Sequence, residues 1–385
     1  MALSQTASAR RIAIAAGGTG GHVNSGLALA EAYRIAVPDV ELLFVGTANG
    51  VERFLVPKRG YRLELIRGTP FYGTSWLQRP HAAAMLAAGF WRARHLLRAE
   101  RIELAIGLGG YASVGTLLAA RSLRIPCAVH ESSREAGRAN RFLARFVDRV
   151  YVAFPGTAGE LPIGKTRYVG MLVSALLRRV GQRRVAPPFG KRPIHLLVTG
   201  GTLGSPLLNR ALPGVVEQLK KRGIDLEVWH QAGDIDRVPW AQRDSRFAGG
   251  DVRAIRAAYA STGVTTRVDA YVDNMAEAYT WADVAVSCGG TTLAELAAVA
   301  LPAIVIPMSV ASDDHQRGNA QAFAEPTGVW WCSEADFRIE EAVARLARLC
   351  TDVDFWKETS MRLCRLATNA APDIVADCEA WLPSK

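Results

Sequence analysis

Four glycine-rich turns, each directly after a short apolar run, constrain the fold of this chain more than any other feature. They are Gly17-Gly-Thr-Gly-Gly21, Gly107-Leu-Gly-Gly110, Gly200-Gly-Thr-Leu-Gly204 and Gly289-Gly290 with the threonines that follow. Glycine has no Cβ and suits sharp strand-to-helix turns, so each turn taken alone is as consistent with a structural role as with ligand binding. Together they mark four strand ends, and open α/β sheets bind ligands at the carboxyl ends of their strands.

Short apolar runs alternate with helix-length segments along the whole chain, which predicts buried parallel strands with crossover helices. The expected strands are 11–16, 41–45, 104–107 and 127–130 in the first half and 194–198, 226–229, 268–271, 284–286 and 303–306 in the second. Residues 181–193 are rich in Pro, Gly and Arg without periodicity and are the best linker candidate. A chain of 385 residues is long enough for two domains. We therefore predict an α/β fold with two Rossmann-like, doubly wound parallel-sheet domains facing a cleft.

Composition excludes several classes of protein. The formal charge of +10 favours an anionic partner, and the six cysteines are widely spaced without a metal-binding pattern, which predicts reduced thiols and no structural zinc. No recognition motif accompanies the charge, so a nucleic-acid partner is not expected. We expect neither a signal peptide nor a spanning helix, and hence a soluble or peripheral protein. Aromatic and basic residues share the segment 80–100, which reads either as a core helix with snorkelling arginines or as a patch for anionic lipid.

The first glycine turn opens into a helical segment and ends in His22. It lacks the lysine of a P-loop and the third glycine of a dinucleotide fingerprint. A helix N-terminus after a glycine turn favours a phosphate or a developing oxyanion. The same dipole disfavours an imidazolium, so His22 is expected to be neutral and able to accept a proton; the alternative is a histidine that only caps the turn.

Two segments of the second half carry polar groups suited to a nucleotide sugar. Thr291 and Thr292 add hydroxyls to the backbone N–H groups of the fourth turn, and Glu295 one helical turn later is placed to accept hydrogen bonds from a ribose diol. The alternative for Glu295 is a carboxylate that serves its own helix. His315 and Gln316 follow an expected strand and suit sugar hydroxyls, although a solvated loop would look similar.

Taken in order, these segments resemble the MurG family of peripheral-membrane glycosyltransferases. The matching motifs are Gly17 to His22, Phe44 to Thr47, Val56-Pro-Lys58, Gly107 to Tyr111, His130-Glu131, Gly200-Gly201, Trp229-His-Gln231, Tyr271 to Met275, Gly289 to Glu295, His315-Gln316 and Asn319-Ala320. The resemblance covers nearly the whole chain. It implies a GT-B fold with an acceptor- and membrane-binding domain at 1–180, the linker 181–193, a nucleotide-sugar domain at 194–350, and C-terminal helices at 351–385 that pack back towards the first domain.

The resemblance also implies the activity: inverting transfer of GlcNAc from UDP-GlcNAc to the MurNAc 4-hydroxyl of lipid I, which forms lipid II for peptidoglycan, cell shape and cell division. His22 would be the general base. The donor contacts would come from Thr19, Gly20, Gly21, Ser133, Thr202, the backbone of Val272, Gly290, Thr291, Thr292, Leu293, Ala294, Glu295, His315 and Gln316. The acceptor contacts would come from Tyr111, His130, Glu131 and Asn140. No bound metal or tightly bound cofactor is implied, and assistance by Mg²⁺ at an acceptor diphosphate stays open.

The implied location is the cytoplasmic face of the bacterial inner membrane, on anionic lipid, with other cell-wall synthesis proteins as further partners. The chain departs from the family pattern at Ser133, where an asparagine is usual, and at Ser174 and Ser287, where arginines are usual. Two alternatives therefore stay open: a GT-B transferase or nucleotide-sugar epimerase with another donor or acceptor, and a catalytically silent scaffold with the same fold.

Overall fold

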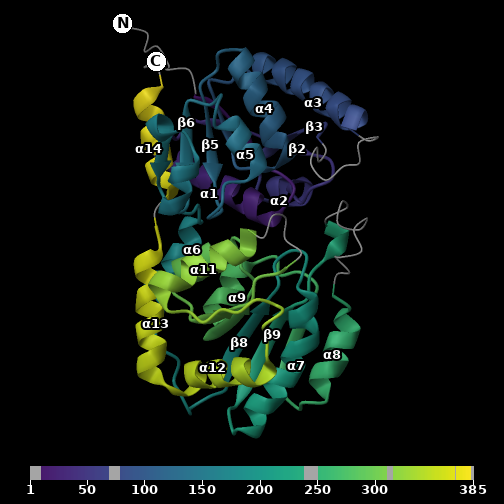
Figure 1. The fold of residues 1–385 in the computed structure, drawn as a ribbon, viewed down its shortest axis with the longest axis vertical. Helices are drawn as coiled ribbons and strands as arrows, with labels where there is room; N and C mark the ends of the chain where they lie inside the picture. Colours follow the sequence, from purple (N-terminus) through teal and green to yellow (C-terminus); the bar gives the residue numbers. More distant parts are fainter. Residues whose placement is uncertain (1–9, 69–78, 238–249, 310–314, 369, 383–385) are drawn as a thin grey trace, which may run out of the picture. The chain divides into compact units, whose positions relative to one another are not determined.

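The computed structural model describes residues 10–68, 79–237, 250–309, 315–368 and 370–382, and it divides into two units (Figure 1). Unit 1 comprises residues 1–132, 136–174 and 369–385, and unit 2 comprises residues 133–135 and 175–368, each within the described part of the chain. Each unit contains one parallel sheet covered by helices. Two parallel sheets with helices constitute the expected two-domain GT-B class.

Unit 1 is built on a seven-stranded parallel sheet of order β3-β2-β1-β4-β5-β6-β7. Its strands are β1 (Arg11–Ala15), β2 (Glu41–Thr47), β3 (Arg62–Ile66), β4 (Leu104–Gly107), β5 (Cys127–Glu131), β6 (Arg149–Val152) and β7 (Thr166–Tyr168). Its α-helices are α1 (Gly20–Ala36), α2 (Glu52–Lys58), α3 (Arg79–Ala99), α4 (Gly110–Ser122), α5 (Arg138–Leu143) and α14 (Ala370–Trp381). Short 3₁₀ turns η1 (Pro155–Glu160) and η2 (Ile163–Lys165) precede β7. The central strands are apolar on both faces and fully buried, as the continuous apolar run Ile12–Ala16 predicts.

Unit 2 is built on a five-stranded parallel sheet of order β10-β9-β8-β11-β12. Its strands are β8 (Ile194–Thr199), β9 (Leu226–Gln231), β10 (Thr265–Asp269), β11 (Val284–Ser287) and β12 (Ala303–Val305). Its α-helices are α6 (Ala175–Gln182), α7 (Pro206–Lys221), α8 (Val252–Ala260), α9 (Met275–Trp281), α10 (Thr292–Ala298), α11 (His315–Thr327), α12 (Ile339–Thr351) and α13 (Val353–Leu366), with the 3₁₀ turn η3 (Ile235–Arg237) after β9. Leu196, Val198 and Val286 of the middle strands are fully buried in its core.

All four glycine turns lie at the two points where strand order reverses. In unit 1, β1 pairs with β4, so the turns after Ala15 and Gly107 leave neighbouring strand ends. In unit 2, Ser287 of β11 pairs with Thr199 of β8, so the turns after them are neighbours in the same way. A topological switch point opens a crevice between diverging loops, and this is where doubly wound sheets bind ligands.

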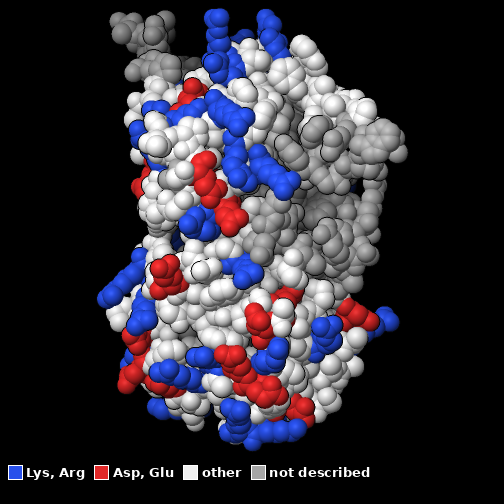
Figure 2. All heavy atoms as spheres, viewed as in Figure 1, with Lys and Arg blue, Asp and Glu red and all other residues white. Residues whose placement is uncertain are grey.

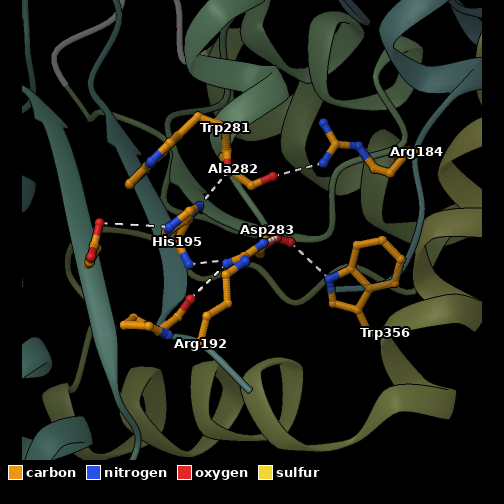
Figure 3. Close-up of polar contacts among 9 residues, drawn as sticks. Arg184, Arg192, His195, Trp281, Ala282, Asp283 and Trp356 are labelled. Atoms are coloured by element: carbon orange, nitrogen blue, oxygen red, sulfur yellow. Dashed lines mark hydrogen bonds and ion pairs between the residues drawn. The ribbon is translucent and has the colours of Figure 1, made fainter. Parts of the chain in front are cut away.

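The chain passes from unit 1 to unit 2 between Ser174 and Ala175, ahead of the segment 181–193 that composition favoured as the linker. The difference arises because α6 packs against α9 and α10 of unit 2. Arg184 then donates to the carbonyl of Ala282 (Figure 3) and to those of Tyr279 and Val299. These contacts fix the following segment to the ends of α9 and α10. The Pro- and Gly-rich segment 181–193 is irregular beyond Gln182, where α6 ends, but it is fixed to unit 2 and does not connect the units freely.

Arg192 completes this anchor at the start of β8. Its guanidinium donates to both carboxylate oxygens of Asp283, at 2.6 and 2.9 Å, and Asp283 also accepts the backbone N–H of His195 at 2.9 Å (Figure 3). Trp356 of α13 donates its indole N–H to the carbonyl of Asp283 at 2.8 Å. The bidentate pair therefore joins the incoming chain, β8 and α13 within unit 2.

The C-terminal helices divide between the units. Helix α13 packs on α10, α11 and α12 of unit 2, whereas α14 packs against α1 of unit 1. The Tyr151 hydroxyl donates to Asp377 of α14 at 2.7 Å, and Arg10 binds Glu379 at 2.9 Å. Within the segment 351–385, α14 thus belongs to unit 1 and α13 belongs to unit 2.

Three strands of unit 1, β3, β6 and β7, are not predicted from the sequence. Strands β3 and β7 lie at the two edges of the unit 1 sheet, where exposed residues such as Leu65 and Tyr168 interrupt a buried apolar run. Strand β6 has only four residues. In unit 2, the expected strand 268–271 is displaced, because β10 begins at Thr265 and ends at Asp269.

Candidate active site

The first glycine turn of unit 1 holds His22 through one backbone carbonyl. His22 Nδ1 lies 3.2 Å from the carbonyl oxygen of Gly17 and 3.5 Å from Thr19 Oγ1. Because a carbonyl only accepts, Nδ1 carries the proton in this contact, and the neutral ring then has its lone pair on Nε2. His22 is partly exposed, and helix α1 begins at Gly20 without a side-chain cap from Thr19. The arrangement suits a proton acceptor beside uncapped helix N–H groups.

A buried carboxylate, Glu52, lies beneath this turn and was not singled out from the sequence. It is fully buried and accepts hydrogen bonds from the backbone N–H groups of Gly18 and Thr47 and from the Thr47 hydroxyl. Glu52 lies in the first turn of α2, where acidic residues are common. The sequence pattern therefore gives no sign that this side chain binds Gly18 and Thr47.

The second glycine turn packs directly on the first. A Cβ added to Gly109 would lie 2.7 Å from His22 Nε2, and one added to Gly110 would lie 2.5 Å from the Gly17 carbonyl oxygen. Both glycines have positive φ, 104° and 78°. Ser113 fixes the turn, since its hydroxyl lies 3.0 Å from the Ala15 carbonyl and 2.7 Å from that of Gly109. The second turn therefore needs glycine at these positions, because a side chain at Gly109 would collide with the imidazole of His22.

The four residues expected to contact the acceptor substrate differ in their exposure to solvent. Tyr111 is 42% exposed at the start of α4, whereas His130, Glu131 and Asn140 are buried. Burial raises the pKa of Tyr111. The Asn140 side chain donates to Glu131 at 2.8 Å, and Gly137 N donates to the same carboxylate oxygen at 2.9 Å. Glu131 thus joins β5 to Gly137, just before α5, and to Asn140 within α5.

The charged form of His130 is disfavoured by its burial. Burial lowers the pKa of His130, and the neighbouring His22 lowers it further, against the opposing effects of the Gly170 carbonyl and Glu131. His130 Nε2 lies 3.0 Å from the Gly170 carbonyl oxygen, so Nε2 carries the proton. Both sequence-selected histidines thus lie in unit 1, and His22 acts on His130 through its charge.

In unit 2, Gln231 joins the third glycine turn to Val272. Its amide N–H₂ donates to the Gly201 carbonyl at 2.8 Å, and its Oε1 accepts the backbone N–H of Val272 at 3.0 Å. Thr202 lies in this turn, and its carbonyl accepts the N–H of Asp234 at 2.9 Å. The Val272 N–H is therefore already paired within unit 2.

The fourth glycine turn has one packed and one open glycine. A Cβ on Gly289 would lie 2.4 Å from the Gln316 carbonyl oxygen, whereas the nearest atom to one on Gly290 is Gln316 Nε2, at 3.8 Å. Gln316 Oε1 accepts the N–H of Met308 at 2.9 Å, which turns the amide N–H₂ towards Gly290. Gly289 is required by packing, and Gly290 borders open space.

Glu295 is held by a tyrosine from the neighbouring helix. The Tyr279 hydroxyl of α9 donates to Glu295 Oε2 at 2.7 Å. Burial raises the pKa of Glu295, and the Tyr279 hydrogen bond opposes that shift. Thr291, Thr292 and Glu295 are all partly exposed, while Leu293 and Ala294 are buried. The carboxylate is therefore oriented with capacity left for further donors.

The remaining expected donor residues lie near α11. Ser133 belongs to unit 2, and its neighbour Arg134 donates its backbone N–H to Asn319 Oδ1 at 2.7 Å. His315 begins α11 and is partly buried. Asp313 and Asp314 lie outside the described residues. Ser287, where the resemblance leads one to expect an arginine, is fully buried, and its hydroxyl donates to the Cys288 carbonyl.

The described residues contain no group of three or more His, Cys, Asp or Glu side chains placed to hold a metal ion. Nor does any helix among them combine the length and apolarity needed to cross a membrane.

Comparison with known proteins extends these observations over the whole chain. The glycosyltransferase family 28 N-terminal domain matches residues 12–152, and the family 28 C-terminal domain matches residues 195–377. A relative from Geobacter sulfurreducens, named UDP-N-acetylglucosamine--N-acetylmuramyl-(pentapeptide) pyrophosphoryl-undecaprenol N-acetylglucosamine transferase, is 37% identical over 81% of this chain and 82% of its own. A relative of the same name from Geotalea daltonii is 33% identical over 95% of this chain and 96% of its own.

Solved structures share the fold. MurG of Acinetobacter baumannii superposes with a TM-score of 0.71 at 24% identity, covering 96% of this chain and 99% of its own. A putative UDP-N-acetylglucosamine 2-epimerase from Listeria monocytogenes superposes with a TM-score of 0.65 at 12% identity, covering 97% of this chain and 96% of its own. Fold alone thus accommodates both a transferase and an epimerase, whereas the two sequence relatives described above both carry the transferase name. The chain belongs to glycosyltransferase family 28, within its MurG group.

Proposed function

We propose that this chain transfers GlcNAc from UDP-GlcNAc to the MurNAc 4-hydroxyl of lipid I with inversion, which yields lipid II for peptidoglycan synthesis. The observation that carries the mechanism is the contact of His22 Nδ1 with the Gly17 carbonyl at a topological switch point. It leaves Nε2 as the proton acceptor. Family membership supplies the substrates, because the relatives are named for this reaction.

Unit 2 is proposed to bind the nucleotide sugar. The Val272 carbonyl would contact uracil beside the turn that contains Thr202, and Glu295 would accept hydrogen bonds from the ribose diol. Gly290 borders open space, so Gly290, Thr291 and Thr292 would approach the diphosphate, with the backbone of Leu293 and Ala294 following. Ser133, His315 and Gln316 would contact the sugar, the last through the N–H₂ that Met308 leaves free.

Unit 1 is proposed to bind the acceptor and supply the base. The exposed ring of Tyr111 is the direct contact, while the buried His130, Glu131 and Asn140 would shape the surrounding loop. As the acceptor hydroxyl attacks the anomeric carbon, Nε2 of His22 takes its proton. The N–H groups at the start of α1, near Thr19, Gly20 and Gly21, would stabilise charge on the departing UDP, because fixed dipoles act where charge develops.

The same unit is proposed to rest on anionic lipid at the cytoplasmic face of the inner membrane. Helix α3 buries Leu96 and Leu97 but leaves Trp91 64% exposed, with the Arg94 guanidinium 6.0 Å from its ring centroid. On the face seen in Figure 2, several Lys and Arg side chains gather over unit 1, and Asp and Glu side chains are visible on both units. Exposed aromatic and basic groups together suit a headgroup surface. Other cell-wall synthesis proteins are the further partners proposed there.

We propose that the reaction needs no tightly bound cofactor, and activity in the presence of EDTA tests whether Mg²⁺ assists. The main experiment follows UDP release from UDP-GlcNAc with and without a lipid I analogue in detergent. Release that depends on the acceptor supports the transferase. Turnover of UDP-GlcNAc without acceptor would instead indicate an epimerase or hydrolase, and no turnover by folded protein would indicate a silent scaffold.

A further inference from the structure

Glu52 is a buried carboxylate whose partners all come from outside its own helix. Its Oε1 accepts the Thr47 N–H at 2.8 Å and the Thr47 hydroxyl at 3.0 Å, and its Oε2 accepts the Gly18 N–H at 3.0 Å. A buried carboxylate is costly unless hydrogen bonds compensate it, and these three donors do so. The proposed reaction as described above does not use this group.

Three glycines make the space that the carboxylate fills. A Cβ added to Gly17 would lie 2.6 Å from Glu52 Oε1, one on Gly46 would lie 2.5 Å from Glu52 Cγ, and one on Gly50 would lie 2.0 Å from Glu52 Oε2. Real Cβ atoms do not approach other heavy atoms so closely, since these distances lie inside van der Waals contact. Gly17 in the first glycine turn is therefore required by Glu52, independently of any ligand.

Glu52 and His22 bind the same peptide group. The Gly18 N–H that donates to Glu52 and the Gly17 carbonyl that accepts from His22 Nδ1 are the two polar ends of the Gly17–Gly18 peptide. A peptide bond is planar, so fixing its N–H direction fixes the direction of its carbonyl. We propose that Glu52 is a positioning residue that, through this peptide, holds His22 with its proton on Nδ1 and its lone pair on Nε2.

Two physical effects follow from this arrangement. The carboxylate orients the carbonyl towards His22, and it also polarises the peptide, because hydrogen bonds in a chain strengthen one another. A better acceptor on Nδ1–H makes Nε2 a better proton acceptor, as the carboxylate does in a Ser-His-Asp triad. Here one backbone peptide stands between the carboxylate and the imidazole.

Replacing Glu52 by Gln separates this role from packing. An amide has one acceptor oxygen, whereas Gly18 and Thr47 present backbone N–H groups to opposite sides of the carboxylate. In either amide orientation one of these N–H groups faces an N–H₂ group, so the E52Q variant cannot satisfy both. Thr47→Val removes only the hydroxyl contact and leaves the Gly18 contact in place.

The first test is spectroscopic and needs no activity. Nitrogen-15 NMR of histidine-labelled full-length protein reports which imidazole nitrogen is protonated, and subtraction of the H22Q spectrum assigns His22 among the seven histidines. We expect Nδ1–H in the native protein and in T47V, and a mixture of tautomers in E52Q. Nε2–H in the native protein, or an unchanged Nδ1–H signal in E52Q, would overturn the proposal. An Nε2–H signal in the native spectrum overturns the proposal even if E52Q fails to fold.

The second test is kinetic and rests on the proposed function. A misplaced base typically costs about 100-fold in rate, so E52Q should lower kcat by about this factor with a smaller change in KM for UDP-GlcNAc. Tyr151→Phe, which removes a buried hydrogen bond to Asp377 in the same unit, is the stability control and should keep kcat. An equal loss of kcat in Y151F and E52Q would assign Glu52 a structural role only.

The two tests fail separately. If the tautomer shifts in E52Q but the native protein transfers no GlcNAc, the proposed function is wrong and the positioning role of Glu52 stands. If transfer is active and the tautomer does not respond, the positioning role is wrong and the function stands.

Discussion

Glu52 and His22 bind opposite ends of one peptide group: the Gly18 N–H donates to Glu52 at 3.0 Å, and His22 Nδ1 lies 3.2 Å from the Gly17 carbonyl oxygen. Strand β1 ends just before this peptide, and β2 ends at Thr47, which binds the same carboxylate. Two neighbouring strands thus place one candidate base. Gly17 of this turn is required by the buried Glu52 carboxylate, so a ligand is not needed to explain a glycine at that position.

His22→Ala should lower kcat by about 10²- to 10⁴-fold, the usual contribution of a positioned general base. The Kd for UDP-GlcNAc should change little, because the proposed part of His22 is proton transfer from the acceptor. Steady-state kinetics together with calorimetric donor binding checks this split. A kcat equal to that of the native protein would remove His22 from the mechanism.

Glu295→Ala should raise KM for UDP-GlcNAc about tenfold or more, since a hydrogen bond to a charged group contributes about 1.5–3 kcal/mol. The kcat value should fall much less. Tyr279→Phe is the matched control, because it removes the hydroxyl that donates to Glu295 and keeps the carboxylate. Equal effects of both changes on thermal stability, with KM unaltered in both, would mean that Glu295 only serves α9 and α10.

Acid should destabilise the fold through His230 before most carboxylates titrate. Burial lowers the pKa of His230 to about 3 from its usual 6.5, and its ring bonds Tyr259 and Asn209, both at 2.9 Å. Below pH 6.5, His230 is protonated in the unfolded chain but stays neutral in the folded chain. The contribution of His230 to the free energy of unfolding is therefore fully present above pH 6.5. As pH falls towards 3, each such histidine removes up to about 1.4 kcal/mol per pH unit.

His130 adds to this slope with the same sign, because burial lowers its pKa too. Chemical unfolding between pH 4 and 7 measures the slope. H230Q should flatten it relative to the native protein, whereas H95Q, at an exposed position of α3, should not. Parallel curves for H230Q and the native protein would contradict the assignment.

Arg192→Ala should destabilise unit 2 by about 2 kcal/mol, because it leaves the buried Asp283 carboxylate without its bidentate partner. Hydrogen exchange followed by mass spectrometry should show lost protection in peptides from β8, β11 and α13, with unit 1 unaffected. Lys221→Ala, which removes an exposed ion pair with Glu217 on α7, is the control and should have no measurable effect. Uniform loss of protection in both units would contradict a local anchor.

Trp91→Ala should weaken binding to anionic vesicles about tenfold, as expected for withdrawing part of an indole from a headgroup region. Co-sedimentation with phosphatidylglycerol vesicles measures the affinity, and phosphatidylcholine vesicles test the charge requirement. Met361→Ala removes a comparably exposed apolar side chain from α13 of unit 2 and should bind as the native protein does. Equal binding of W91A and M361A would mean that α3 is not the membrane contact.

The sequence predicts the two sheets well because their central strands contain continuous apolar runs, as in Ile12–Ala16 and Leu196–Val198. It predicts the glycine turns because each directly follows such a run. The role of each glycine in these turns could not be predicted, because it depends on contacts between residues far apart in the sequence. Gly17 packs against Glu52, which lies 35 positions later, and Gly289 packs against Gln316. Likewise, the pairing of Glu131 with Asn140 and of Glu295 with Tyr279 requires the packed structure.

The most direct test of the central claim is product analysis after incubating the full chain with labelled UDP-GlcNAc and a lipid I analogue. The account predicts a lipid product that carries one labelled GlcNAc on the MurNAc 4-hydroxyl, with inverted anomeric configuration, and no such product from H22A at comparable enzyme and time. A folded native protein that gives no labelled lipid, or gives it with retained configuration, would contradict the account.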